Sequence, residues 1–201
     1  TACILETAKQ GHKTYKARIF ITDTPCPNCM KNMAESGISN LYIDHKGFDK
    51  DWAKRRSDSF ENMSMRVAER AGIDVFVIYR KEQRYEVISR HMAGYKPPIE
   101  HPAIIETSHD SFEDLIKRAH KSEGDEPFAL ALTDEGKYIL VDRHPTVGYT
   151  VDTIEPKDDK YSFILQPLNR LLMIASKEGL TLNAKHIYSS RVPTSRELVN
   201  F

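Results

Sequence analysis

Two cysteines three residues apart are the part of this sequence best suited to chemistry. They lie in residues 24–29 (TPCPNC), where Pro25 suits the first turn of a helix. On such a turn the two thiols point the same way, and the partial positive charge of the helix N-terminus favours thiolates. Two thiolates so placed can supply half of a tetrahedral zinc site. The sequence therefore predicts that Cys26 and Cys29 are zinc ligands.

Two other interpretations of the cysteine pair remain open. A strand followed by C-x-x-C and a helix is also the thioredoxin arrangement, in which the helix activates a redox thiol. The residues before Cys26 lack the aromatic that usually accompanies that motif. A purely structural zinc site would need two further ligands, for which Cys3, His12 and His45 are candidates without the paired spacing of a zinc finger.

The residues around the pair alternate between predicted strands and helices. Apolar residues at three- and four-residue spacing predict helices, and runs rich in β-branched and aromatic residues predict strands. Because short connections join them, we expect an α/β layer with largely parallel strands. The helices are predicted at residues 1–11, 26–36 and 57–71, and the strands at residues 17–22, 40–44 and 74–80.

Prolines mark a change in the middle of the chain. Pro97, Pro98 and Pro102 interrupt a stretch without periodicity, so we expect a linker at residues 95–110 between domains at residues 1–94 and 111–201. In the second domain, a polar turn with glycine between two β-type runs predicts a hairpin. Its elements are predicted as a helix at 111–120, strands at 128–132 and 137–141, a helix at 167–178, a strand at 185–189 and a helix after Pro193.

The composition limits the classes of partner. Lys plus Arg and Asp plus Glu both number 29, so the formal net charge is zero and a nucleic-acid polymer is an unfavoured partner. No apolar run approaches the ~18 residues of a membrane span. The three cysteines cannot form a closed disulfide framework, which favours a reduced, cytoplasmic protein without a membrane partner.

A shift of 168 residues aligns the end of the chain with its beginning. It pairs Gly11 with Gly179 and Pro25 with Pro193, and the order helix, glycine, strand, proline, helix agrees throughout. Further identities pair Lys9 with Lys177, Ile19 with Ile187 and Asn32 with Asn200. The sequence therefore predicts two copies of one domain, each incomplete in this chain.

On these residues the chain resembles the cytidine and deoxycytidylate deaminase superfamily. The family signature joins H-x-E on one helix to P-C-x-x-C at the next, and Pro25, Cys26 and Cys29 match its second half. The resemblance covers residues 1 to about 80 and reaches residues 111–201 only through the repeat. It implies two tandem α/β/α domains, a Zn²⁺ cofactor on the two cysteines, and hydrolytic deamination of a cytosine-type or other nucleobase nucleoside or nucleotide.

The H-x-E half of the signature is absent from the chain. Residues 1–4 (TACI) match the helix just after it, so the third zinc ligand and the proton-transferring glutamate are expected before Thr1. In an alternative register, residues 1–3 would be a degenerate H-x-E. We expect no catalytic residue within this chain and no activity from it alone. A fragment of a longer protein is favoured over a pseudoenzyme.

The second copy is predicted to have lost the metal. Cys26 and Cys29 pair with Thr194 and Glu197, and the positions of the histidine and glutamate fall on Leu165 and Pro167. This copy is expected to pack as a non-catalytic partner, in an intramolecular pseudo-dimer or a homo-oligomer. A different function class also stays open, namely a binding or scaffold protein built from two decayed deaminase domains.

Five further residues are candidates for contact with the substrate. Thr22, Thr24 and Pro25 match positions that shape the pocket floor in the family, although Thr24 is favoured as a helix cap. Phe48 and Trp52 flank the polar loop after the second strand and could stack on a base. Packing of Trp52 on the following helix is the favoured alternative.

Overall fold

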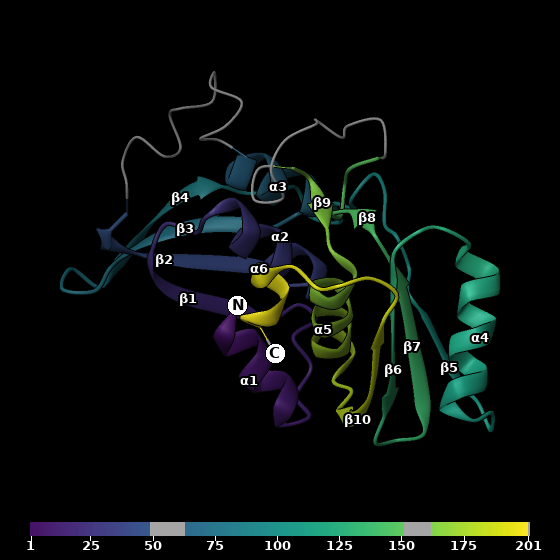
Figure 1. Cartoon of the computed structure of the whole chain (residues 1–201). Helices are drawn as coiled ribbons and strands as arrows, with labels where there is room; N and C mark the ends of the chain where they lie inside the picture. The colour runs from purple at the N-terminus through teal and green to yellow at the C-terminus, as the bar shows by residue number, and fades with distance from the viewer. Residues whose placement is uncertain (49–62, 151–161, 201) are drawn as a thin grey trace. The chain divides into compact units, whose positions relative to one another are not determined.

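The structure is a computed structural model that describes residues 1–48, 63–150 and 162–200. Within these residues the chain is a mixed α/β protein with two compact units (Figure 1). Unit 1 consists of Thr1–Thr14, His101–His144 and Ile164–Phe201, and unit 2 consists of Tyr15–Glu100 and Pro145–Phe163. Each unit combines separate segments, whereas the predicted domains are continuous stretches of sequence.

Unit 2 is built on a four-stranded sheet with two helices on one face (Figure 1). The first three strands run parallel, as predicted, and the fourth returns antiparallel to the third. The strand order is β1 (Arg18–Asp23), β2 (Asn40–Gly47), β3 (Asp74–Tyr79) and β4 (Arg84–Ser89). The helices are α2 (Pro27–Glu35) and α3 (Met63–Ala71).

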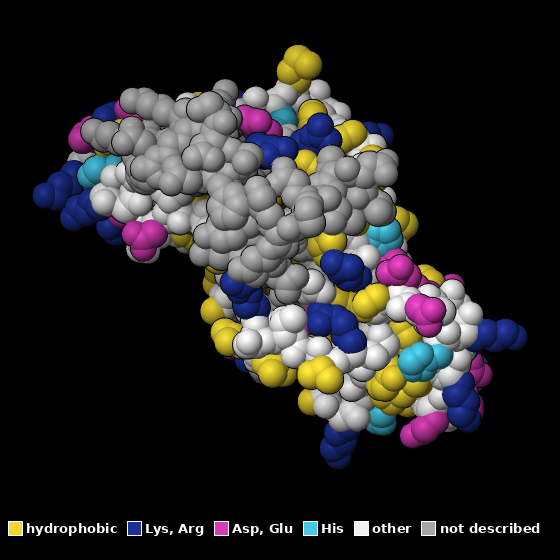
Figure 2. Space-filling model, turned by 45° about the horizontal axis from the view of Figure 1, so that its top comes forward, with side chains coloured by type: hydrophobic (Ala, Val, Ile, Leu, Met, Phe, Trp, Pro, Cys, Tyr) yellow, Lys and Arg dark blue, Asp and Glu magenta, His cyan; other side chains and the backbone are white. Residues whose placement is uncertain are grey.

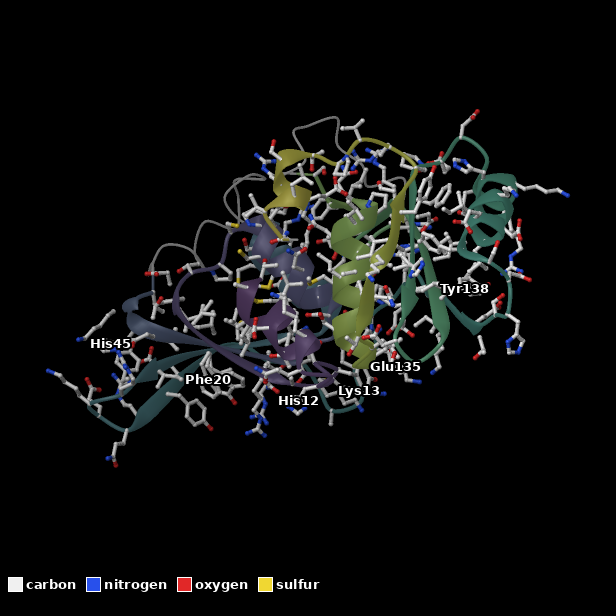
Figure 3. The ribbon with its side chains drawn as sticks, turned by 60° about the horizontal axis from the view of Figure 1, so that its bottom comes forward. His12, Lys13, Phe20, His45, Glu135 and Tyr138 are labelled. Atoms are coloured by element: carbon white, nitrogen blue, oxygen red, sulfur yellow. The ribbon has the colours of Figure 1, made fainter. Side chains whose placement is uncertain are left out.

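The two faces of this sheet differ, because alternate residues of a strand point to opposite sides. The face under α2 and α3 carries the core, whose buried residues include Ile19, Leu41, Ile43, Val75 and Val77 from the strands and Met30, Met33, Val67 and Ala68 from the helices. On the other face the rings of Phe20, Tyr42 and Phe76 stack at centroid distances of 4.7 and 4.8 Å. Phe20 is 65% exposed there (Figure 3), so this second face is open in unit 2.

Unit 1 places an antiparallel sheet between two helices (Figure 1). One apolar cluster joins the sheet to α5 around Leu171 and Ile139, and a second joins it to α4 around Leu115 and Phe128. The strand order is β10 (Leu182–Ser189), β6 (Phe128–Thr133), β7 (Lys137–Asp142) and β5 (Ile104–Thr107). The two helices beside the sheet are α4 (Phe112–Glu123) and α5 (Pro167–Glu178). The remaining elements are α6 (Ser195–Leu198) and a short sheet of β8 (His144–Pro145) and β9 (Ile164–Leu165).

Helix α1 (Ala2–Lys9) belongs to unit 1 and packs on α5. Its Ile4 is buried, and the chain that follows it donates a hydrogen bond from the backbone N–H of Thr14 to the carbonyl of Ser176 at 3.0 Å. Gly179, in the left-handed region at φ 67°, lies against the backbone of Lys13. The shift of 168 residues pairs α1 with α5, so two elements predicted to be equivalent are in contact.

Most predicted elements are present, but β4, β5 and the two-residue strands β8 and β9 were not foreseen. β5 lies inside residues 95–110, which the sequence predicts as a linker, and pairs antiparallel with β7. Its four residues are too few for alternation to be recognised beside three prolines. β4 is exposed along most of its length, so it lacks the apolar pattern of a buried strand. The strands of unit 1 are antiparallel, so parallel pairing holds for unit 2 alone.

Two pairs of positions related by the shift of 168 residues have similar backbone angles, although the paired strands β1 and β10 differ in their pairing, parallel for β1 and antiparallel for β10. Gly11 and Gly179 both lie in the left-handed region, at φ 71° and 67°. Cys26 and Thr194 are both helix N-caps, with φ and ψ of −69° and 164° for Cys26 and −71° and 157° for Thr194. No helix in the described part of the chain is both long and apolar enough to cross a membrane.

Candidate metal site

The cysteine pair lies where β1 gives way to α2. Cys26 is the N-cap of α2, and Pro27 is its first residue. Because a residue before proline is kept out of the helical region, Cys26 is extended and the helix starts after it. The expectation that Thr24 caps this helix is therefore wrong, since the cap position belongs to Cys26.

The distance between the two thiols fits a shared metal ion. Cys26 Sγ lies 3.5 Å from Cys29 Sγ, and neither cysteine forms a disulfide. A tetrahedral zinc ion with Zn–S bonds of about 2.3 Å holds its thiolates about 3.8 Å apart. Cys26 is exposed and Cys29 is half-buried. The pair can thus occupy two positions of a zinc site that is reached from solvent.

The helix itself explains why the two thiols meet. Cys26 and Cys29 occupy the N-cap and N3 positions of α2, whose side chains face each other in a capping box. In most helices a hydroxyl and a carboxylate at these positions satisfy the free backbone N–H groups. The partial positive charge at the start of a helix stabilises thiolates placed there.

Ser64 of α3 supports the residue before the pair. Its hydroxyl donates to the carbonyl of Pro25 at 2.9 Å, and the Ser64 side chain is fully buried. This bond ties the loop that carries Cys26 to the core helix. Sequence reasoning missed Ser64, although a serine between Met63 and Met65 on a buried helix was a usable signal.

We expect Ser64→Ala to lower the free energy of unfolding by about 1–3 kcal/mol, because the buried carbonyl of Pro25 loses a donor. It should also weaken binding of metal to the cysteine pair, since the loop loses its anchor. Chemical denaturation and a competitive zinc titration measure the two effects. Ser190, whose hydroxyl bonds a backbone N–H in unit 1, provides the comparison: Ser190→Ala should leave zinc affinity unchanged.

The structure places the other predicted substrate contacts in different surroundings. Thr22 lines a shallow cavity of about 190 Å³ on the open face of the sheet, with Phe20 and Tyr42. Pro25 is buried and Phe48 is half-buried directly after β2. Trp52 lies outside the described residues. Asp23 pairs with Gly47, so the segments that carry Cys26 and Phe48 start from neighbouring strand ends.

The ends of β1 and β2 approach unusually closely. A Cβ atom added to Gly47 would lie 2.0 Å from the backbone oxygen of Thr22, so only glycine fits. Nearby, the backbone N–H of Lys46 donates to Asp44 at 3.0 Å, and Arg80 pairs with the same carboxylate. These contacts hold the pKa of Asp44 below its usual value. Asp44 is therefore ionised at neutral pH and already balanced by charge.

The cysteine pair is not part of a larger set of potential metal ligands in the described part of the chain. No group of three or more His, Cys, Asp or Glu is placed to hold a metal ion among residues 1–48, 63–150 and 162–200. His45 stacks on Tyr79 at 5.0 Å and faces Asp44, which gives it neighbours other than a metal. Figure 3 labels His45 and Phe20, which both belong to the sheet of unit 2.

The surface charge agrees with the balanced composition. Figure 2 shows basic and acidic side chains interspersed over the described part of one face, without a broad basic region.

Comparisons with family models, curated proteins and solved structures find no match for this chain.

Proposed function

We propose that this protein is a zinc-dependent hydrolytic deaminase of a cytosine-type or other nucleobase nucleoside or nucleotide. Cys26 and Cys29 would hold the ion, with a histidine ligand and a proton-transferring glutamate contributed from outside the described residues. The observation that carries the proposal is the thiol pair, 3.5 Å apart at the N-cap and N3 positions of a helix that follows a parallel strand.

The surroundings of the pair support a catalytic site over a purely structural one. In open α/β sheets, ligands bind beyond the carboxyl ends of the strands, and both cysteines follow the end of β1. Cys26 is exposed, whereas structural zinc is usually enclosed by four protein ligands. A zinc ion bound there would supply Lewis-acid activation of water. The proposed pocket would admit a small substrate rather than a polymer, in keeping with the interspersed charges of Figure 2.

A non-catalytic binding or scaffold protein built from two deaminase-like domains is the second candidate. It is favoured by the second copy, in which Thr194 and Glu197 stand at the positions paired with the cysteines. In both candidate functions Cys26 and Cys29 bind zinc, but only the deaminase converts a substrate.

Ammonia release by the zinc-loaded protein at its natural length tests the proposal. Cytidine, deoxycytidine, deoxycytidylate, adenosine and guanosine form the substrate panel. We expect release from at least one cytosine compound, and we expect Cys29→Ser to abolish it. Ser36→Ala, a buried serine at the other end of α2, serves as the matched variant that retains release. Bound zinc without release from any compound would favour the scaffold function.

A further inference from the structure

An apolar cavity of about 230 Å³ lies within unit 1. Helix α5 contacts both α1 and β10, and residues of these three elements line the cavity (Figure 1). Its apolar lining is provided by Leu5, Leu172, Ala175, Leu180, Leu182 and Ile187. All of these residues belong to unit 1, so the cavity is separate from the cysteine pair in unit 2.

A bulge in β10 borders the cavity. Strands β10 and β6 pair on either side of residues 183–186, which stand opposite Leu132 alone. Leu182 and Ile187 flank this bulge and line the cavity, as does Ala184 within it. Bulges are common next to active sites, where they redirect side chains. The departure of β10 from the ladder thus coincides with the wall of the cavity.

The bulge is held by contacts of its own. The side-chain oxygen of Asn183 accepts from the backbone N–H of Lys185 at 3.1 Å and lies 3.2 Å from His186 Nδ1. The ring of His186 also packs edge-on against Phe112 of α4, at a centroid distance of 5.2 Å. These contacts fix the course of β10 at the cavity wall.

A single charge accompanies the apolar lining. Of the lining residues that the structure describes, only Lys9 is charged, and Thr181 and Asn200 are polar. Lys9 Nζ lies 3.6 Å from the carboxylate of Glu6, and the two side chains are 72% and 62% exposed. An exposed pair of this kind contributes little, so a ligand carboxylate can compete for the ammonium group. The lining is therefore complementary to a molecule with an apolar body and a negative end.

The volume of the cavity limits the size of that molecule. An apolar cavity of about 150 Å³ is large enough to hold benzene. A helix of a protein partner, about 10 Å across, is too wide for the cavity in unit 1. We propose that unit 1 binds a small amphipathic carboxylate here, with an apolar chain of about six to nine carbon atoms in the cavity and its carboxylate on Lys9. The site does not depend on zinc or on catalysis in unit 2.

Titration of the zinc-free full chain with sodium octanoate tests the proposal. Calorimetry should show one site with a dissociation constant of about 1 mM or lower. Methyl NMR should show saturable shifts at Leu5, Leu172 and Leu182. Hexanoate should bind about tenfold more weakly, because it buries two fewer methylene groups. The proposal is overturned if these methyl groups do not respond to octanoate up to about 10 mM.

Filling the cavity should block binding. Ala184 is exposed at the cavity wall, so Ala184→Leu should fold and weaken octanoate binding about tenfold or more. Ala175→Leu fills the cavity from α5 and should have the same effect. Ala2→Leu adds the same bulk at an exposed position of α1 outside the lining, and should leave the affinity unchanged. Unchanged binding by the folded Ala184→Leu variant would contradict the location.

Removing the charge separates the two halves of the ligand. Lys9→Met should weaken octanoate binding about three- to fivefold and leave binding of 1-octanol unchanged, because the alcohol has no charge to pair. Lys13 pairs with Glu178 at 3.8 Å and is also exposed, so Lys13→Met is the matched variant and should alter neither affinity. Equal loss of octanoate affinity in both variants would show a general charge effect and would contradict the role of Lys9.

Discussion

Replacing Arg170 with methionine is expected to lower the free energy of unfolding by about 3 kcal/mol, because it breaks an ion pair whose guanidinium is buried and whose carboxylate is half-buried. Arg170 belongs to α5 and is 1% exposed, and its guanidinium pairs with the carboxylate of Asp142 and donates to the carbonyl of His101. It thereby ties α5 to the end of β7 and to the segment before β5. Methionine fills a similar space but cannot satisfy either acceptor.

Urea denaturation followed by circular dichroism measures this effect. Arg143 lies next to Asp142 in sequence and is exposed, so Arg143→Met is the matched variant and should change the free energy by no more than about 0.5 kcal/mol. Asp142 also contacts His144, at 2.8 Å, and keeps that partner in the variant. Equal effects of the two substitutions would show that the buried guanidinium contributes little.

The reactivity of the three cysteines provides a second large effect. When zinc is bound, alkylation of Cys26 and Cys29 by iodoacetamide should slow by about a hundredfold, because the thiolates that attack are held by the metal. Cys3 is exposed on α1 and lies in the other compact unit. Its rate should stay the same, which makes it a control within the same molecule.

Peptide mass spectrometry after timed alkylation resolves the three sites. Removal of zinc by a chelator should restore reaction at Cys26 first, since Cys26 is exposed and Cys29 is half-buried. Protection of all three cysteines, or of none, would contradict a metal held by this pair.

The cysteine site was largely predictable because its signals are local. Proline and the C-x-x-C spacing mark the end of β1 and the start of α2 within one residue of the structure. The prediction that Thr24 caps α2 was wrong because Pro27 excludes Cys26 from the helix, so the helix begins one residue later than predicted. The local sequence pattern thus located the two thiols, but it did not show that they occupy the N-cap and N3 positions of α2.

The features that were missed depend on contacts between distant residues. Ser64 supports the site across 39 residues of chain, and Glu197 reaches the backbone of Leu168 across 29. A sequence pattern cannot show that a glutamate in a short terminal helix faces the start of another helix. β5 was missed for a related reason, because a four-residue edge strand is defined by its partner β7 rather than by its own residues.

The shift of 168 residues pairs few identical residues. It also pairs two helix N-caps, Cys26 and Thr194, and two left-handed glycines, Gly11 and Gly179. The strands that it pairs differ, since β1 lies parallel to its neighbour and β10 lies antiparallel.

The most direct test of the central claim is the zinc content of the protein, purified at its natural length without added chelator. The account predicts one zinc ion per chain, and it predicts the loss of that ion in the variant with Cys26→Ser and Cys29→Ser. Zinc-free protein in which Cys26 and Cys29 form a reversible disulfide would contradict the account and favour the redox interpretation.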